Sequence, residues 1–168
     1  MLLQLLVGGL ISAVNIGFYA LVTVVAVGIA RSAGLRRSGR PRLRLMGVMI
    51  ATAAVLKLAH TVEILVWAWT YDLVGAAESG ADLLYFAFVN YTTLGYGDIT
   101  PVREWRLIGP LTAMNGVLLF GWSAAILFEV LRKTLDRVGL TEVPPPSSRR
   151  FGVPMLRRVG ANDQRPHA

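Results

Sequence analysis

The sequence predicts an all-α membrane protein with three transmembrane helices and a short re-entrant helix between the second and the third. Hydrophobic residues make up 54% of the 168 positions, and the mean hydropathy of +0.54 is too apolar for an ordinary soluble domain. Three apolar segments are long enough to cross a bilayer, which takes about 20 residues each. Basic residues gather in the segments between and after these spans, as they do in cytoplasmic loops.

The first predicted span covers residues 1–30, which carry no charged side chain. A secretory signal would have a basic residue before a shorter apolar core, so this segment is predicted to be a membrane helix. Residues 31–44 are predicted to form a cytoplasmic loop because of their arginines. These are Arg31, Arg36, Arg37, Arg40, Arg42 and Arg44.

Residues 45–131 are predicted to form one module with two further spans. The second span begins at residue 45, and the third covers residues 107–131. Between them, residues 82–92 are apolar and aromatic but too short to cross the membrane. Such a segment is tolerated at membrane depth only where protein or a water-filled cavity satisfies its end, so a re-entrant helix is expected.

Residues 132–168 are predicted to be a basic, disordered cytoplasmic tail, because they contain a proline run and few large apolar residues. Counting spans gives a multi-pass protein with its N-terminus outside and its C-terminus in the cytoplasm, suited to a bacterial inner (plasma) membrane. The net charge of +7 lies mainly in the predicted cytoplasmic segments, so membrane orientation explains it and no nucleic-acid partner is expected. The chain has no cysteine, which excludes disulfides and thiolate metal sites.

A polar, glycine-spaced motif, Thr-Thr-Leu-Gly-Tyr-Gly-Asp, follows the re-entrant helix at residues 92–98. A dehydrated monovalent cation needs oxygen ligands on all sides, and backbone carbonyls supply them without net charge. Successive carbonyls can point the same way only if some residues take positive φ, which Gly95 and Gly97 permit at little steric cost. Thr93 can add a hydroxyl oxygen. The motif therefore predicts a cation site made of backbone oxygens.

This motif, placed between two spans, resembles the selectivity filter of the pore-loop potassium channel superfamily, with Leu94 at the usual Val position. The resemblance covers about residues 45–131. It implies a homotetramer in which each chain supplies a quarter of the pore, with K⁺ as the transported ion, the bilayer as surroundings and no cofactor. The filter residues that it implies are Thr93, Leu94, Gly95, Tyr96 and Gly97, with the K⁺ ligands on Thr93, Leu94, Gly95 and Tyr96.

The resemblance also implies that Asp98 lies at the outer mouth, where a ring of carboxylates concentrates cations. The first helix is additional to the minimal pore unit and is expected to pack outside it. One departure concerns the pore helix, where family members often carry Trp at the position of Phe86 and some carry a carboxylate at that of Val89. Those groups hydrogen-bond the Asp or Tyr of the filter, and Phe and Val cannot, which affects how long the filter stays conductive.

Two glycines in the third span, Gly116 and Gly121, are candidate hinges for gating, and close packing between helices is the alternative. In the same span, Asn115 and Ser123 either face a water-filled cavity or serve as hydrogen-bond partners between helices. The sequence leaves both questions open.

Lys57, His60 and Glu63 lie inside the second span, where ionisable groups are costly and usually functional. Their helical spacing places them on one broad face. Either they form a neutralised packing cluster or they sense protons, since histidine titrates near physiological pH. Depth counted along the spans places Glu63 level with Asn115 of the third span. It places His60 and Lys57 level with Ser12, Asn15 and Tyr19 of the first, so both helices could supply partners.

The sequence predicts a potassium-selective channel that conducts K⁺ passively. Two alternatives remain, a non-conducting or modulatory membrane subunit and a weakly selective cation channel. The intact motif at residues 92–98 favours selective conduction, because loss of Tyr96 or of a glycine is the expected mark of the others. No nucleophile–base pair or phosphate-binding loop points to an enzyme.

Overall fold

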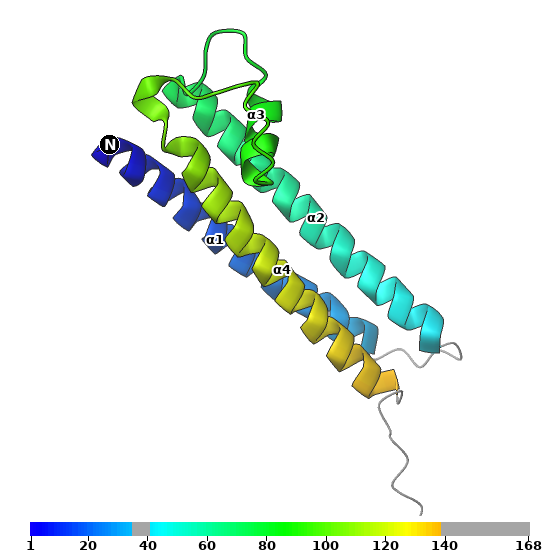
Figure 1. The fold of residues 1–168 in the computed structure, drawn as a ribbon. Helices are drawn as coiled ribbons and strands as arrows, with labels where there is room; N and C mark the ends of the chain where they lie inside the picture. The colour runs from blue at the N-terminus through cyan, green and yellow to red at the C-terminus, as the bar shows by residue number, and fades with distance from the viewer. Residues whose placement is uncertain (35–40, 139–168) are drawn as a thin grey trace, which may run out of the picture.

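The computed structural model describes residues 1–34 and 41–138, and these residues form helices without any strand. The elements are α1 (Leu2–Gly34), α2 (Pro41–Val74), α3 (Leu83–Tyr91), the short 3₁₀ turn η1 (Arg103–Trp105) and α4 (Ile108–Val138) (Figure 1). The predicted all-α class is therefore confirmed for the described residues. Residues 35–40 of the predicted loop and 139–168 of the predicted tail lie outside them.

Three helices are long and apolar enough to cross a membrane, with candidate spans at Leu2–Gly28, Arg42–Val74 and Arg103–Asp136. The helices extend further than the predicted spans. Helices α1 and α2 continue into the arginine-rich segment, and α4 runs past residue 131 to Val138. The difference arises because hydropathy marks only the apolar part of a helix, whereas arginine and lysine are good helix formers and extend it.

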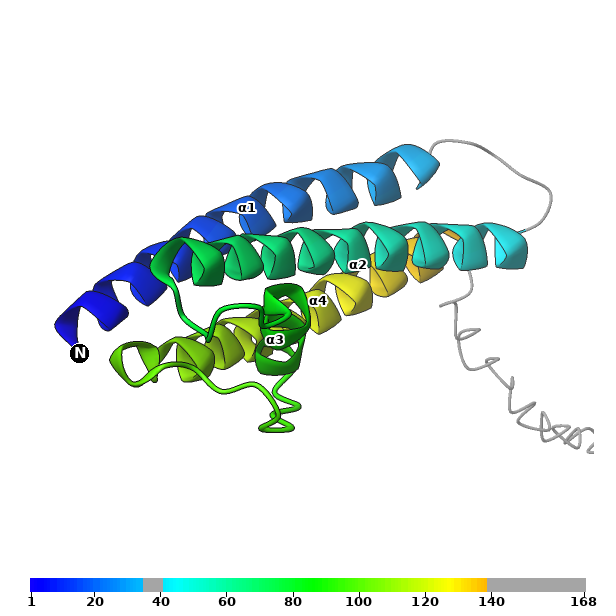
Figure 2. The same cartoon turned by 90° about the horizontal axis from the view of Figure 1, so that it is seen from above.

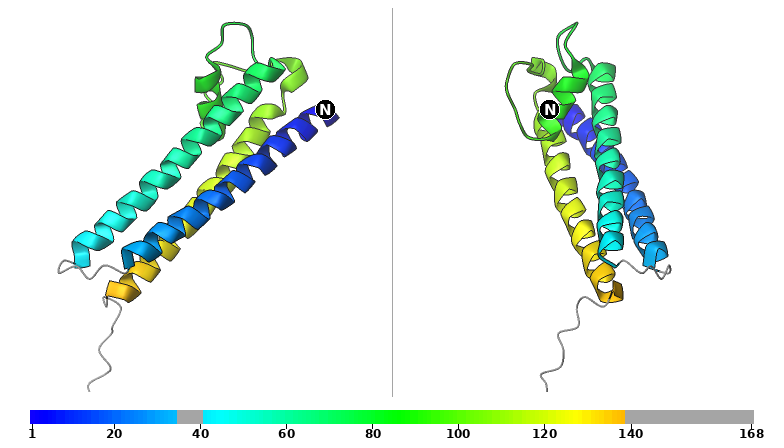
Figure 3. Two further views of the ribbon diagram at one scale, coloured as in Figure 1. Left: turned by 180° about the vertical axis from the view of Figure 1, so that it is seen from behind. Right: turned by 90° about the vertical axis from the view of Figure 1, so that its right-hand side faces the viewer.

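The long helices α1, α2 and α4 run side by side, and α3 lies between α2 and α4 near one end (Figures 1 and 3). The N-terminus of α1 lies at this same end (Figure 1). Helix α1 packs against α4 and α2 on the side away from α3 (Figure 2). The first helix thus lies outside the unit formed by α2, α3 and α4.

Two buried clusters hold the helices together. The cluster at the α3 end is aromatic and joins α2, α3 and α4; its largest members are Trp67, Tyr71, Phe86 and Tyr91. The cluster further along the bundle joins α1, α2 and α4 and is mostly aliphatic, with Tyr19 as its one aromatic member that is fully buried. Aromatic rings are rigid and carry polar handles, so the first cluster both packs α3 and supplies hydrogen bonds to it.

Helix α1 is also tied to the turn that begins α4. The side-chain amide of Gln4 donates to the carbonyl of Glu104, and its oxygen accepts from the backbone N–H of Leu107 at 2.9 Å. The first N–H groups of a helix have no partner inside that helix, so Gln4 satisfies a group that would otherwise be unpaired. This contact holds the α1 N-terminus at the level of η1.

Candidate functional site

Helix α3 has defined ends that aim it at the motif that follows. Asp82 is its N-cap, with an extended backbone and a carboxylate that accepts from the N–H of Tyr85 at 3.0 Å. The helix ends at Tyr91, and the hydroxyl of Thr92 donates back to the carbonyl of Phe88 at 2.7 Å. The C-terminal end of a helix carries partial negative charge, so this end favours a nearby cation.

The motif that follows α3 alternates in backbone conformation. Positive φ occurs at Thr93 (60°), Gly95 (58°) and Gly97 (78°), and not at Leu94 or Tyr96 between them. Where residues of positive φ alternate with residues of negative φ, successive N–H groups can point to one side of the chain and the carbonyls to the other. The positive φ predicted for Gly95 and Gly97 is present. That of Thr93 was not predicted, because a β-branched residue rarely adopts it.

Hydrogen bonds to α3 fix which side the carbonyls face. The N–H groups of Leu94 and Gly95 donate to the carbonyl of Val89 at 2.9 and 3.4 Å, and that of Thr93 donates to Asn90 at 3.0 Å. In a trans peptide the carbonyl points opposite to the N–H of the next residue, and no described peptide bond is cis. The carbonyls of Thr93 and Leu94 therefore point away from α3, toward the open face of the chain.

The other end of the motif is held by a side chain that the sequence analysis missed. The hydroxyl of Tyr85 donates to Asp98 at 2.6 Å. This hydrogen bond lowers the pKa of the Asp98 carboxyl and raises the pKa of Tyr85 to about 12. The predicted departure at Phe86 therefore does not leave Asp98 without a partner. The available signal was a hydroxyl-bearing aromatic residue one position earlier, in the first turn of α3.

Phe86 and Val89 act through packing and backbone instead. Phe86 is 2% exposed, with its ring centroid 5.0 Å from that of Tyr71 in the aromatic cluster. The side chain of Val89 cannot accept a hydrogen bond, but its carbonyl accepts from the motif as described above. Both residues support α3 without making the side-chain bonds that the family pattern implies.

The two candidate hinge glycines differ in their surroundings. Gly116 is buried, and a Cβ atom there would overlap the backbone carbonyl of Tyr91 at the end of α3. Gly121 is exposed in the single chain, and a Cβ atom there would meet no atom within 4 Å. The geometry favours the packing role for Gly116, because only glycine permits this close approach. For Gly121 the hinge role stays a prediction.

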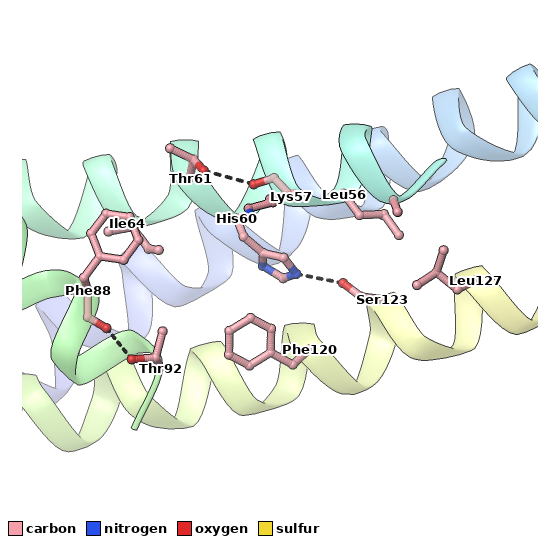
Figure 4. Close-up of a pocket in the computed structure, with 11 residues that line it drawn as sticks. Leu56, Lys57, His60, Thr61, Ile64, Phe88, Thr92, Phe120, Ser123 and Leu127 are labelled. Atoms are coloured by element: carbon pink, nitrogen blue, oxygen red, sulfur yellow. Dashed lines mark hydrogen bonds between the residues drawn. The ribbon is translucent and has the colours of Figure 1, made fainter. Parts of the chain in front are cut away.

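The structure divides the predicted cluster of Lys57, His60 and Glu63. Glu63 is completely buried, and the Nδ1 atom of His60 lies 3.3 Å from its Oε2 atom. The side chain of Lys57 is exposed and has no ion pair within the described residues. It lies with His60 along a cavity of about 320 Å³ beneath α3, which Phe88 and Phe120 also line (Figure 4).

The partners of His60 and Glu63 come from the other helices. The hydroxyl of Tyr91 donates to Glu63 Oε2. The hydroxyl oxygen of Ser123 lies 2.7 Å from Nε2 of His60 (Figure 4). Tyr19 of α1 is hydrogen-bonded to Ser123. Ser123 is therefore a partner between helices. The side-chain amide of Asn115 is buried and has no protein hydrogen-bond partner among the described residues.

Residues 59–133 match a protein-family model that is described as "Ion channel". The matched segment begins in α2 and ends in α4, so it includes α3 and the motif at residues 92–98. No curated protein and no solved structure matches the chain.

Proposed function

Because residues 59–133 match the ion-channel family model, we propose that this chain is a homotetrameric channel that conducts K⁺ passively across a membrane. The observation that carries the proposal is the alternating backbone of residues 93–97, with positive φ at every second position. This conformation presents a row of carbonyl oxygens on one side of the chain.

The ligands of K⁺ would be the carbonyls of Thr93, Leu94, Gly95 and Tyr96, together with the Thr93 hydroxyl. Stacked carbonyl oxygens replace the water shell of the ion, which allows K⁺ to pass without net charge on the protein. Gly97 completes the alternation, and Asp98 would concentrate cations at the outer mouth.

One chain offers ligands on one side only, so an ion is enclosed only when several copies face each other. The exposure of the motif in the single chain supports this arrangement, since Leu94 is 54% and Tyr96 67% exposed. A stripe on α4 is exposed in the same way and would line the pore or contact the neighbouring copies. Its large members are Met114, Val117, Leu118 and Phe128.

In the membrane, the end of the bundle that carries α3 and the motif would face the outside. The N-terminus would then lie outside and the C-terminus in the cytoplasm, as the charge pattern predicts. The basic segment before α2 and the basic end of α4 would then lie in the cytoplasm, as the positive-inside rule requires. The membrane would be a bacterial inner (plasma) membrane.

The test is ion flux in liposomes that contain the purified full chain. We expect K⁺ flux well above Na⁺ flux, and crosslinking in mild detergent should trap species up to four chains. Equal K⁺ and Na⁺ flux would instead identify a weakly selective cation channel. No flux from a chain that still assembles would identify a non-conducting subunit, and a stable monomer would overturn the tetramer.

A further inference from the structure

Four deeply buried side chains of α1, α2 and α4 carry polar atoms that have no hydrogen-bond partner among the described residues. They are Asn15 of α1, Glu63 and Trp67 of α2 and Asn115 of α4, and none is more than 3% exposed. The atoms are Nδ2 of Asn15, Oε1 of Glu63, Nε1 of Trp67, and both Nδ2 and Oδ1 of Asn115. Buried polar atoms are nearly always hydrogen-bonded, so a group of this kind requires an explanation.

Two hydrogen-bonded contacts between helices bracket these four residues. The first lies near the start of α4, where Tyr71 of α2 donates to Thr112 at 2.6 Å. The second lies further along the bundle, where Ser123 of α4 is 2.7 Å from Nε2 of His60 and is hydrogen-bonded to Tyr19 of α1. The same number of residues separates the two contacts on α2 and on α4. The two helices therefore keep one register between the contacts.

This register places the four residues at two levels. Trp67 and Asn115 each lie one helical turn from the first contact, on the faces of α2 and α4 that make it. Glu63 and Asn15 each lie one turn from the second contact, on the faces of α2 and α1 that make it. Ile11 of α1 also packs against the cluster that contains Trp67. Asn115 is thus level with Trp67, about one turn from the depth that counting along the spans gives.

Each level offers a donor on one helix and an acceptor on another. The indole N–H of Trp67 donates and Oδ1 of Asn115 accepts, while Nδ2 of Asn15 donates and Oε1 of Glu63 accepts. Neither donor is hydrogen-bonded directly to the acceptor at its level. Polar groups that match but lie beyond direct reach are commonly bridged by water, which donates and accepts at once.

Water fits these atoms better than an ion does. The donors are N–H groups, which cannot coordinate a cation, and the described residues contain no cluster of three His, Cys, Asp or Glu side chains that could hold a metal. An anion would lie beside the carboxyl oxygen of Glu63, which disfavours it. A buried water typically makes about three hydrogen bonds to polar groups that otherwise lack partners.

We propose that Asn15, Glu63, Trp67 and Asn115 form an internal binding site for ordered water, which joins α1 to α2 and α4. At the first level a water accepts from Trp67 and donates to Asn115. At the second level a water accepts from Asn15 and donates to Oε1 of Glu63.

The second water also supports the end of α3. Oε2 of Glu63 accepts from the hydroxyl of Tyr91, the last residue of α3. A water on Oε1 fixes the orientation of the same carboxyl group. Helix α1, which lies outside the unit of α2, α3 and α4, thus reaches α3 through one water and one side chain (Figure 2). This site does not depend on the proposed channel function.

The test is the transfer of nuclear magnetisation from water to side chains in the full chain, embedded in liposomes and labelled with ¹⁵N in tryptophan and asparagine. The chain has four tryptophans, and Trp67→Phe identifies the indole signal of Trp67. We expect cross-peaks between water and this indole N–H and between water and the amides of Asn15 and Asn115. Asn115→Leu removes the acceptor and should abolish the peak at Trp67. Met114→Leu, at the exposed neighbouring position, is the matched control and should preserve it.

Two results would contradict the water site. Absence of water transfer to all three side chains of the unaltered protein would overturn it. If the indole of Trp67 receives no transfer but shifts its resonance in Asn115→Leu, the two side chains are bonded directly and the first water is ruled out.

Thermal unfolding in detergent tests the attachment of α1. Asn15→Leu removes the donor to the second water, so Oε1 of Glu63 loses its bridge at a position with no solvent exposure. The unfolding temperature should fall, although leucine is the more apolar side chain, because a buried acceptor is left unpaired. Val14→Leu, at the exposed neighbouring position, is the control and should unfold like the unaltered protein. An Asn15→Leu variant that unfolds at or above the control temperature would overturn the role of water in holding α1.

Discussion

The same chemical contact, a tyrosine hydroxyl that donates to a carboxylate, holds both ends of the motif that follows α3. At the inner end Tyr91 bonds Glu63, and both side chains are completely buried. At the outer end Tyr85 bonds Asp98, a carboxylate that is exposed. In the first case other protein atoms surround the bond, and in the second water can replace either partner.

This difference teaches that burial, rather than the bond itself, determines what each contact contributes. A buried polar group that loses its partner cannot recover the bond from water, so the full cost of removing the group from water remains. At the contact between Tyr85 and Asp98, water competes for both groups, and the contact selects an orientation of Asp98 more than it stabilises the fold. The predictions below test this contrast.

The largest expected effect is on the segment between the two contacts. Gly95→Ala places a Cβ atom on a residue with a φ of 58°, which strains the backbone by about 1–2 kcal/mol and disorders the carbonyl row. K⁺ flux in liposomes should be abolished. Gly80→Ala is the control, since Gly80 also has positive φ (87°) but lies in the turn before α3. Normal flux in Gly95→Ala would rule out the filter assignment.

A second effect concerns the backbone beneath the inner contact. Gly116→Ala forces α4 away from the carbonyl of Tyr91 and should cost about 1–3 kcal/mol in stability, with loss of flux. Gly47→Ala in α2 is the control, because a Cβ atom there meets nothing within 4 Å. Thermal unfolding in detergent measures both variants. If they unfold at the same temperature, the close approach at Gly116 does not matter.

A third effect compares the two hydroxyls directly. Tyr91→Phe leaves the buried carboxylate of Glu63 without one donor and should destabilise the protein by about 1–3 kcal/mol. Tyr85→Phe, made in the same way at the exposed contact, should produce a smaller decrease in unfolding temperature. Equal decreases in the two variants would show that burial does not separate the contacts.

The smallest effect is the response of the outer contact to pH. The hydrogen bond lowers the pKa of Asp98 from 3.8, so its stabilisation is present above that value and is lost as pH falls through the lowered pKa. The same hydrogen bond raises the pKa of Tyr85 from 10.0 to about 12. Its contribution to stability is therefore fully present below 10.0 and is lost as pH rises through about 12. Between 3.8 and 10.0 the contact does not titrate.

Tyr85→Phe should therefore leave the pH profile of K⁺ flux unchanged in shape from about pH 5 to 8, a range in which neither an aspartate nor a tyrosine ordinarily titrates. A changed profile in Tyr85→Phe would show that the contact between Tyr85 and Asp98 titrates in this range.

Much of this protein can be predicted from its sequence, because membrane spans and glycine spacing are local signals. The apolar spans, the short α3 and the positive φ of Gly95 and Gly97 follow from hydropathy, segment length and the steric freedom of glycine. These properties depend on neighbours in the chain or on the thickness of the bilayer. No tertiary contact is needed to state them.

Only the tertiary structure decided which side chains act together. Helical spacing on α2 grouped Lys57 with His60 and Glu63, but packing separates the exposed lysine and brings in Tyr91 and Ser123 from other helices. In the same way, Tyr85 reaches Asp98 because α3 and the segment after it run back alongside each other. The physical reason is that a hydrogen bond depends on distance and direction in space, and residues from different helices acquire both only when the helices pack.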